Sequence, residues 1–100
     1  MTKPISMLGS GSRFSPGNIV STPGALAALR EHGKQPCDLL DRHLAGDWGD
    51  VCPGDAIRND QSLAHGERLF SAYEIASGVV VWVITERDRA LTTLLLPHEY

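Results

Sequence analysis

His43 is the side chain in this sequence best suited to moving protons. Its imidazole titrates near neutral pH, as general acid–base catalysis requires, and it follows Arg42 near the end of a predicted helix. Arg68 begins a stretch rich in β-branched and aromatic residues, where a guanidinium could bind a phosphate through two parallel hydrogen bonds. Thr85 and Thr93 add hydroxyls to otherwise apolar strands. His43, Arg68, Thr85 and Thr93 therefore form a candidate catalytic set.

Each of these side chains also fits an ordinary structural role. A histidine in the last turn of a helix is stabilised by the helix dipole, and an arginine at the start of a strand is commonly exposed. Threonine favours strands, which accounts for the hydroxyls without any catalysis. The catalytic hypothesis requires His43, Arg68 and a threonine hydroxyl to converge in one cleft. It fails if His43 and Arg68 lie on opposite sides of the sheet.

No ligand set for a metal or cofactor stands out in the chain. Cys37 and Cys52 are far apart, and there is no CxxC or HxxxH spacing among the cysteines and the four scattered histidines. Zinc sites need convergent ligand spacing. No GxGxxG or phosphate-binding glycine loop precedes a helix. We therefore expect neither a metal nor a cofactor.

Composition and charge narrow the class of protein. With 100 residues, of which 42% are hydrophobic and 21% charged, the chain is typical of one soluble globular domain. Two cysteines and the absence of a signal peptide favour the cytoplasm. The longest apolar stretch, Val79 to Thr85, is too short to cross a bilayer. Residues 35–67 carry seven acidic side chains against two arginines, which disfavours a broad nucleic-acid surface.

The element pattern indicates an α+β fold. Helices are predicted at 23–32, from Pro36 to about residue 45, and at about 55–65. Proline or a capping residue begins each segment, or glycine ends it. Strands are predicted at 68–76, 79–86 and 91–96, with a short strand at Ile19–Val20. We expect a flexible arm at 1–18 and one domain at 19–100. In that domain, two or three helices pack on a three- or four-stranded antiparallel meander.

The predicted central strand, 79–85, is apolar on both faces. Three short helices can cover only one face of such a sheet, and a large bare apolar face usually marks an interface. We therefore expect the other face to meet a protein partner or a second copy, or to be covered by the arm through Ile5, Met7, Leu8 and Phe14. Simple pairing places Tyr73 opposite Trp82 and Thr85 opposite Leu91. The expected interface is centred on Trp82 or on Val81, and its residues are Tyr73, Val81, Trp82 and Leu94.

Several segments resemble a small bacterial family that is carried on plasmids and integrative elements and is usually described only as plasmid-related. The resemblance covers roughly residues 18–100 and implies a mobile-element setting without an established activity. The segments that carry it are Thr22–Leu29, Gly46–Val51, Leu69–Tyr73, Val81–Glu86 and Thr92–Tyr100.

A second resemblance concerns the architecture. The chain has helices with an Arg-His pair, the Gly66-Glu67-Arg68 strand start and a meander that ends in threonines and a tyrosine. This order is similar to ribonucleases of the barnase–EndoU–colicin–RelE type. These enzymes cleave RNA without metal. Our first expectation is a cytoplasmic mobile-element accessory protein that acts by protein–protein interaction, in plasmid maintenance or anti-defence. The alternative is a metal-independent ribonuclease-like toxin or processing enzyme that uses His43 and Arg68, and only that alternative implies RNA as a partner.

Overall fold

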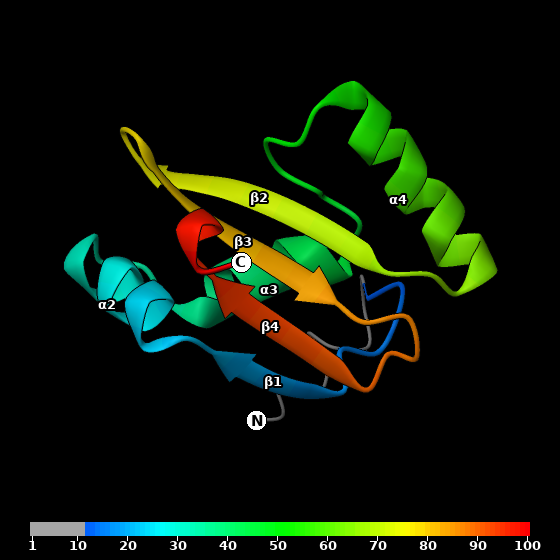
Figure 1. Cartoon of the computed structure of the whole chain (residues 1–100), viewed down its shortest axis with the longest axis horizontal. Helices are drawn as coiled ribbons and strands as arrows, with labels where there is room; N and C mark the ends of the chain where they lie inside the picture. Colours follow the sequence, from blue (N-terminus) through cyan, green and yellow to red (C-terminus); the bar gives the residue numbers. More distant parts are fainter. Residues whose placement is uncertain (1–11) are drawn as a thin grey trace.

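The computed structural model describes residues 12–100 (Figure 1). Three helices follow a first short strand, and three strands and a short 3-10 turn complete the chain. The elements are β1 (Asn18–Ser21), α2 (Pro23–Glu31), α3 (Pro36–Leu44), α4 (Pro53–His65), β2 (Leu69–Ala76), β3 (Val79–Thr85), β4 (Leu91–Leu95) and η1 (Pro97–Glu99). The predicted α+β class and the three helices are confirmed. None of the helices within residues 12–100 is long and apolar enough to cross a membrane.

The helix ends follow from local sequence. Thr22 caps α2 by accepting a hydrogen bond from the Ala25 amide at 3.1 Å. Proline occupies the first turn of all three helices, where its missing N–H costs nothing. Gly66 ends α4 in the left-handed conformation, at φ 70°. These signals account for helix boundaries that agree closely with those expected from the sequence.

The four strands form a mixed sheet in the order β1-β4-β3-β2. β2, β3 and β4 make the expected antiparallel meander, whereas β1 pairs with β4 in parallel. The prediction of a purely antiparallel sheet is therefore wrong at this strand. Three helices and two strands separate β1 from β4 in the sequence, so no hairpin forces the two to run in opposite directions.

The register differs by one residue from simple hairpin pairing. A bulge between Glu74 and Ala76 shifts β2 against β3, so Tyr73 lies opposite Val81 rather than Trp82. Thr85 likewise lies opposite Thr92 rather than Leu91. A shift of one residue moves a side chain to the other face of the sheet. Tyr73 and Trp82 consequently lie on opposite faces.

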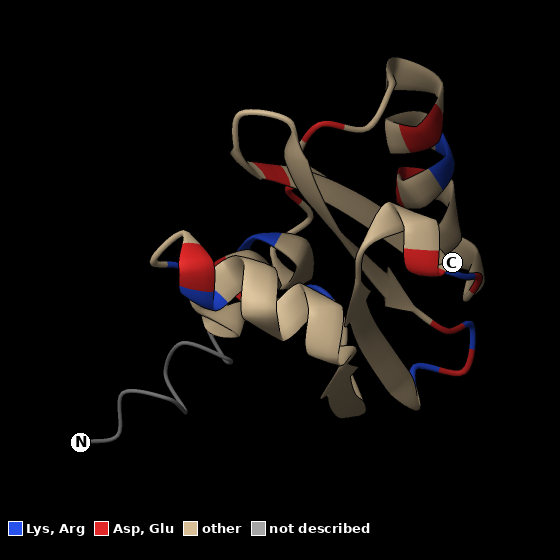
Figure 2. Ribbon diagram, turned by 60° about the vertical axis from the view of Figure 1, so that its left-hand side comes forward, with Lys and Arg blue, Asp and Glu red and all other residues tan. Residues whose placement is uncertain are grey.

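Helices α2 and α3 cover one face of the sheet, which we call the core face (Figure 2). Tyr73, Val81 and Leu94 lie there and are 1%, 0% and 0% exposed. These three residues of the expected interface are therefore core residues with no surface to offer a partner. The core cluster also includes residues from both helices and from β3: Ala25, Leu29, Leu39, Leu40 and Val83.

The other face, which we call the open face, carries α4 and the C-terminal turn (Figures 1 and 2). Of the expected interface residues, only Trp82 lies here, and it is half-buried. The turn is fixed to the start of α2, because the Glu99 carboxylate accepts hydrogen bonds from the Thr22 hydroxyl at 2.6 Å and the Leu96 amide at 2.8 Å. This anchoring carries the Tyr100 ring over Trp82.

The N-terminal residues 12–17 are attached to the domain, and we call them the N-terminal strap. The Arg13 amide donates to the Leu44 carbonyl at 2.7 Å, and the Pro16 carbonyl accepts from the Thr92 hydroxyl at 2.7 Å. The Phe14 ring packs on His43 rather than on the open face. The expected arm at 1–18 thus includes bonded residues and the first residue of β1. Its other apolar residues, Ile5, Met7 and Leu8, lie outside the described residues.

Candidate functional site

The first predicted catalytic residue, His43, is buried in the core face. It lies near the end of α3 and is fully enclosed. Its Nδ1 is 2.6 Å from the Ser71 Oγ of β2, and its Nε2 is 2.9 Å from the Thr85 Oγ1 of β3. The imidazole therefore joins one helix to two strands through both ring nitrogens.

The hydrogen bonds around His43 form a chain with one direction. The Thr92 hydroxyl donates to the Pro16 carbonyl, which can only accept. Thr92 must therefore accept from Thr85, whose Oγ1 lies 2.7 Å away. Thr85 in turn accepts from His43 Nε2–H, which leaves Nδ1 to accept from Ser71. The network fixes the Nε2–H tautomer and ends on the N-terminal strap.

The surroundings of His43 keep the imidazole neutral. The rings of Phe14 and Trp48 pack edge-on against it, with centroids 5.3 and 5.8 Å away. Burial, and secondarily the positive charge of Arg89, lowers the pKa of His43 to about 4. A neutral, enclosed imidazole whose two nitrogens are both bonded within the core presents neither nitrogen to a substrate. This arrangement suits a structural role.

Arg68 lies on the open face, opposite His43. It shares this face with Phe70 and Trp82, and its guanidinium carbon lies 5.4 Å from the centre of the Tyr100 ring. Of the two predicted threonines, Thr85 bonds to His43 on the core face, while Thr93 pairs with Ile84 on the open face. The structure therefore divides the predicted catalytic set between the two faces, and the cleft that the ribonuclease hypothesis requires is not formed.

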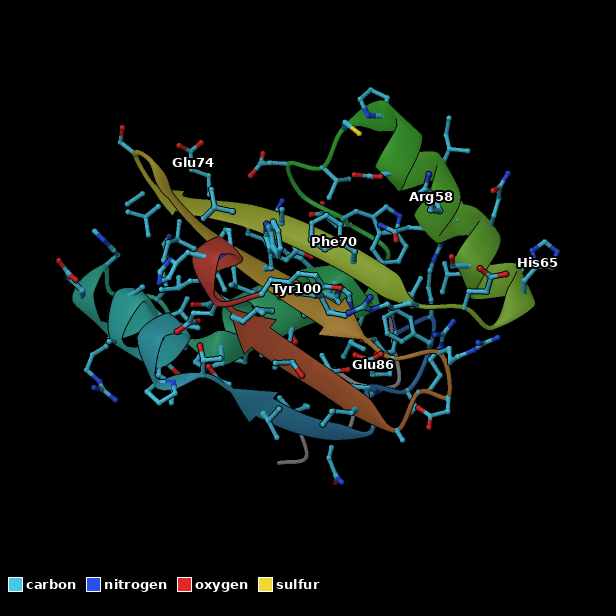
Figure 3. All side chains as sticks on the ribbon, viewed as in Figure 1. Arg58, His65, Phe70, Glu74, Glu86 and Tyr100 are labelled. Carbon is cyan, nitrogen blue, oxygen red and sulfur yellow. The ribbon has the colours of Figure 1, made fainter. Side chains whose placement is uncertain are left out.

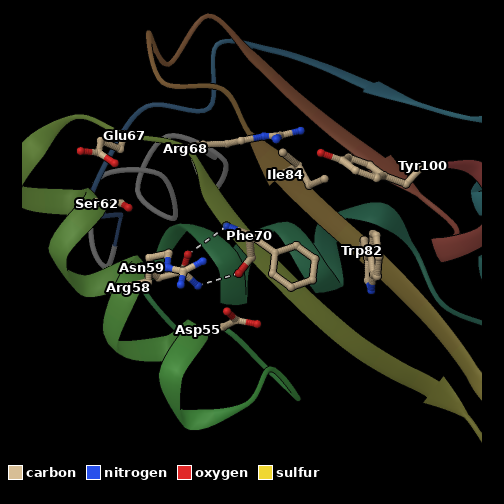
Figure 4. A pocket seen from close by; sticks show the side chains of 10 residues that line it. All are labelled: Asp55, Arg58, Asn59, Ser62, Glu67, Arg68, Phe70, Trp82, Ile84 and Tyr100. Carbon is tan, nitrogen blue, oxygen red and sulfur yellow. Dashed lines mark hydrogen bonds between the residues drawn. The ribbon is translucent and has the colours of Figure 1, made fainter.

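The open face holds a pocket of about 360 Å³ between α4 and the sheet (Figure 4). Its floor is apolar, and arginine and acidic side chains stand around it. The lining residues are Asp55, Arg58, Asn59, Ser62, Glu67, Arg68, Phe70, Trp82, Ile84 and Tyr100.

Three aromatic rings form one wall of this pocket. Phe70 and Trp82 meet at right angles, with centroids 5.0 Å apart, and Trp82 and Tyr100 meet edge to face at 5.8 Å. Such perpendicular pairs are favourable arrangements that hold each ring in place. Figure 3 shows Phe70 and Tyr100 on the same side of the sheet as Arg58 of α4. Tyr100 is 67% exposed, so the end of this aromatic row is open to a ligand.

Helix α4 is held at a fixed position beside the pocket. The Asn59 side chain donates to the Phe70 carbonyl at 2.6 Å and accepts from the Phe70 amide at 3.0 Å. Trp48 Nε1 donates to the Asp60 carboxylate at 3.1 Å. At the other end of the helix, the Arg89 guanidinium donates to the carbonyls of Ser62 and Glu67, at 3.1 and 2.6 Å. The pocket is therefore bounded by rigid elements.

The charges around the pocket are only partly balanced. Arg68 is 3.7 Å from Glu86, and both side chains are exposed, so this ion pair is loose. Arg58 is exposed and makes no ion pair with any residue from 12 to 100. Asp55 and Glu67 lie on the α4 side of the pocket. Arg58 therefore has a guanidinium available to a ligand.

Sequence reasoning found Trp82 and Arg68 but missed Arg58, Phe70 and Tyr100 as members of one site. Residues two apart on a strand point to the same face of the sheet. The sequence therefore predicts that Arg68 lies on one face with Phe70, and Trp82 on one face with Ile84. The contributions of α4 and of the C-terminal turn depend on long-range packing.

No group of three or more His, Cys, Asp or Glu side chains that could hold a metal ion occurs in the described part of the chain. The sequence matches no family model, and no curated protein or solved structure gives a match. The open-face pocket is therefore the candidate site on the strength of its own geometry.

Proposed function

We propose that this protein is a non-catalytic binding module whose open-face pocket holds a segment of a partner protein. The observation that carries the proposal is the row of Phe70, Trp82 and Tyr100 beside a pocket that α4 leaves open. Tryptophan, tyrosine and arginine are the residues most enriched at the energetic centres of protein interfaces. All three types meet at this pocket.

The pocket favours a particular kind of partner segment. An apolar or aromatic side chain would enter between α4 and the aromatic row, next to the apolar side chain of Ile84. A neighbouring Asp or Glu of the partner would meet the free guanidinium of Arg58. We therefore propose a partner peptide that carries a bulky apolar anchor with a carboxylate close by.

A nucleic-acid ligand is less well supported at this site. Aromatic rings and arginines can stack on unpaired bases, but Asp55, Glu67 and Glu86 also lie at or next to the pocket. The chain carries a formal charge of −3, and phosphate binding depends on an excess of lysine and arginine. These charges favour a protein segment over a nucleic-acid strand.

Selection from a displayed library of random peptides, with the full chain as bait, tests this proposal. We expect enriched peptides to combine Trp, Phe or Leu with Asp or Glu. Arg58→Glu should weaken their binding at least tenfold. Arg87→Glu changes the charge equally at an exposed position outside the pocket and should leave binding unchanged. If no peptides are enriched, or if Arg58→Glu and Arg87→Glu behave alike, the proposal is wrong.

The cellular setting forms part of the same proposal. The resemblance to a plasmid-related family supports a mobile-element accessory role, in plasmid maintenance or anti-defence. Cys37 and Cys52 are both exposed and unpaired, which suits the reducing cytoplasm. The ribonuclease alternative is not carried forward, because His43 and Arg68 lie on opposite faces of the sheet.

A further inference from the structure

The two edges of the sheet differ sharply in how their backbone groups are bonded. At the β2 edge, Asn59 satisfies both the amide and the carbonyl of Phe70. The Ala72 amide donates to the Trp48 carbonyl at 3.1 Å, and the Ala72 carbonyl accepts from the Asp50 amide at 2.6 Å. No further strand can add here without displacing these bonds.

The β1 edge has no such cover among the described residues. The amides of Asn18 and Thr22 donate to carbonyls next to and within β4, at 3.0 Å each. Because successive residues of a strand point their backbone groups to opposite sides, Ile19 and Ser21 point theirs away from the sheet. Within residues 12–100, no hydrogen bond reaches the amide or carbonyl of either residue across this edge. Exposed edges of this kind pair readily with another strand.

The side chains along this edge are uncharged, and the two central ones, Ile19 and Val20, are apolar. Ile19 and Val20 are 48% and 45% exposed. No charged residue occurs from Asn18 to Leu29, which includes all of β1 and most of α2, and Figure 2 shows charges on α2 only near its C-terminal end. Lysine or proline within the strand, the usual protection of an edge, is absent from β1.

We infer that the β1 edge binds a second copy of this chain, so that two β1 strands pair antiparallel across a twofold axis at Val20. Two copies of an uncharged surface can meet without like-charge contact, although each chain is acidic as a whole. Ile19 of one copy then lies opposite Ser21 of the other. Each of these two pairs exchanges both backbone hydrogen bonds, which gives four bonds in total. Val20 faces its own counterpart at the central pair, where strands approach most closely.

The inferred dimer is a continuous eight-stranded sheet with both open-face pockets accessible. A four-residue strand buries little surface, so the interface falls below the roughly 1,600 Å² of standard complexes and dimerisation is expected to depend on concentration. The inference does not rely on the proposed peptide-binding function, because the pocket and the β1 edge involve different residues.

Sedimentation velocity of the full chain over a range of concentrations tests the inference. We expect a reversible monomer–dimer equilibrium that Val20→Lys shifts to monomer. Ile57→Lys, a matched change at an exposed apolar residue of α4, should have no effect. A wild-type chain that stays monomeric at all concentrations overturns the inference, as does a dimer that is insensitive to Val20→Lys. If only a chain lacking residues 1–11 dimerises, those residues occupy the edge instead.

A disulfide between the two copies provides an independent test of the register. In a Cys37→Ser, Cys52→Ser background, Val20→Cys places two thiols at a central pair whose Cα separation, about 4.5 Å, suits a disulfide. Mild oxidation should convert this variant to a covalent dimer. Ile57→Cys in the same background should stay monomeric. Equal cross-linking of the two variants, or none in Val20→Cys, contradicts the proposed pairing.

Discussion

At the scale of single residues, the His43 network is the most unusual feature of this small core. Four side chains that could have been apolar, Ser71, His43, Thr85 and Thr92, are fully buried and bonded to one another. Buried polar groups are tolerated when each has a partner. Because the network joins α3, β2, β3, β4 and the N-terminal strap, it can be satisfied only when all five segments are in place.

Thr85→Val tests the contribution of this network. The change keeps the side-chain shape but leaves His43 Nε2–H without an acceptor. It also removes the hydroxyl that donates to the Thr92 oxygen. We expect a loss of about 1–3 kcal/mol in the free energy of unfolding, measured by urea denaturation. Thr93→Val is the control, because the Thr93 hydroxyl makes no hydrogen bond within residues 12–100. Equal effects of the two changes would contradict the network's role.

His43 also predicts how stability depends on pH. Its pKa falls from 6.5 in the unfolded chain to about 4 in the native state, so folding favours the neutral imidazole. The contribution of this pKa shift to the free energy of unfolding is complete above pH 6.5 and is lost as the pH falls toward 4. It amounts to about 3 kcal/mol. We expect His43→Gln to lack this part of the pH dependence, measured by denaturation at several pH values, whereas the exposed His65→Gln should retain it. Identical pH profiles for wild type and His43→Gln would refute the assignment.

At the scale of elements, the sequence predicted the types of the helices and strands better than their pairing. Proline, threonine and glycine at the helix ends are local signals, and strands β2 to β4 follow from runs of β-branched residues. The bulge near Glu74 has no comparable local signal, and it places Tyr73 and Trp82 on opposite faces. The shift explains why Tyr73 was grouped with Trp82, whereas Val81 and Trp82 are neighbours on β3 and lie on opposite faces in any register.

The loop that closes the β2 edge depends on Gly49. This residue has φ 76°, and a Cβ there would collide with the Ala72 carbonyl and the Tyr73 ring. Gly33 has a similar φ of 68°, but its surroundings are empty. Gly33→Ala should therefore cost only the backbone strain, about 1 kcal/mol. Gly49→Ala should cost clearly more, measured by thermal or urea unfolding. A similar loss at both positions would show that the close approach at Gly49 does not matter.

At the scale of the whole molecule, α2 and α3 account for one face of the sheet and leave the other to α4 and the C-terminal turn. The composition of β3 indicated that both faces need cover. It could not indicate that α4 would be bonded to the β2 edge through Asn59, which leaves a pocket over Phe70 and Trp82. The candidate site is a product of this placement, and for that reason the sequence revealed only some of its residues.

The two tryptophans offer the most direct measurement of whether the open-face pocket binds a ligand. The Trp82 indole lies in the pocket wall, whereas the Trp48 indole is buried and bonded to Asp60. In ¹H–¹⁵N spectra of the full chain, titration with a peptide enriched by selection should shift the indole signal of Trp82 and leave that of Trp48 in place. A peptide that binds without moving the Trp82 signal, or that moves both indole signals alike, would contradict the account.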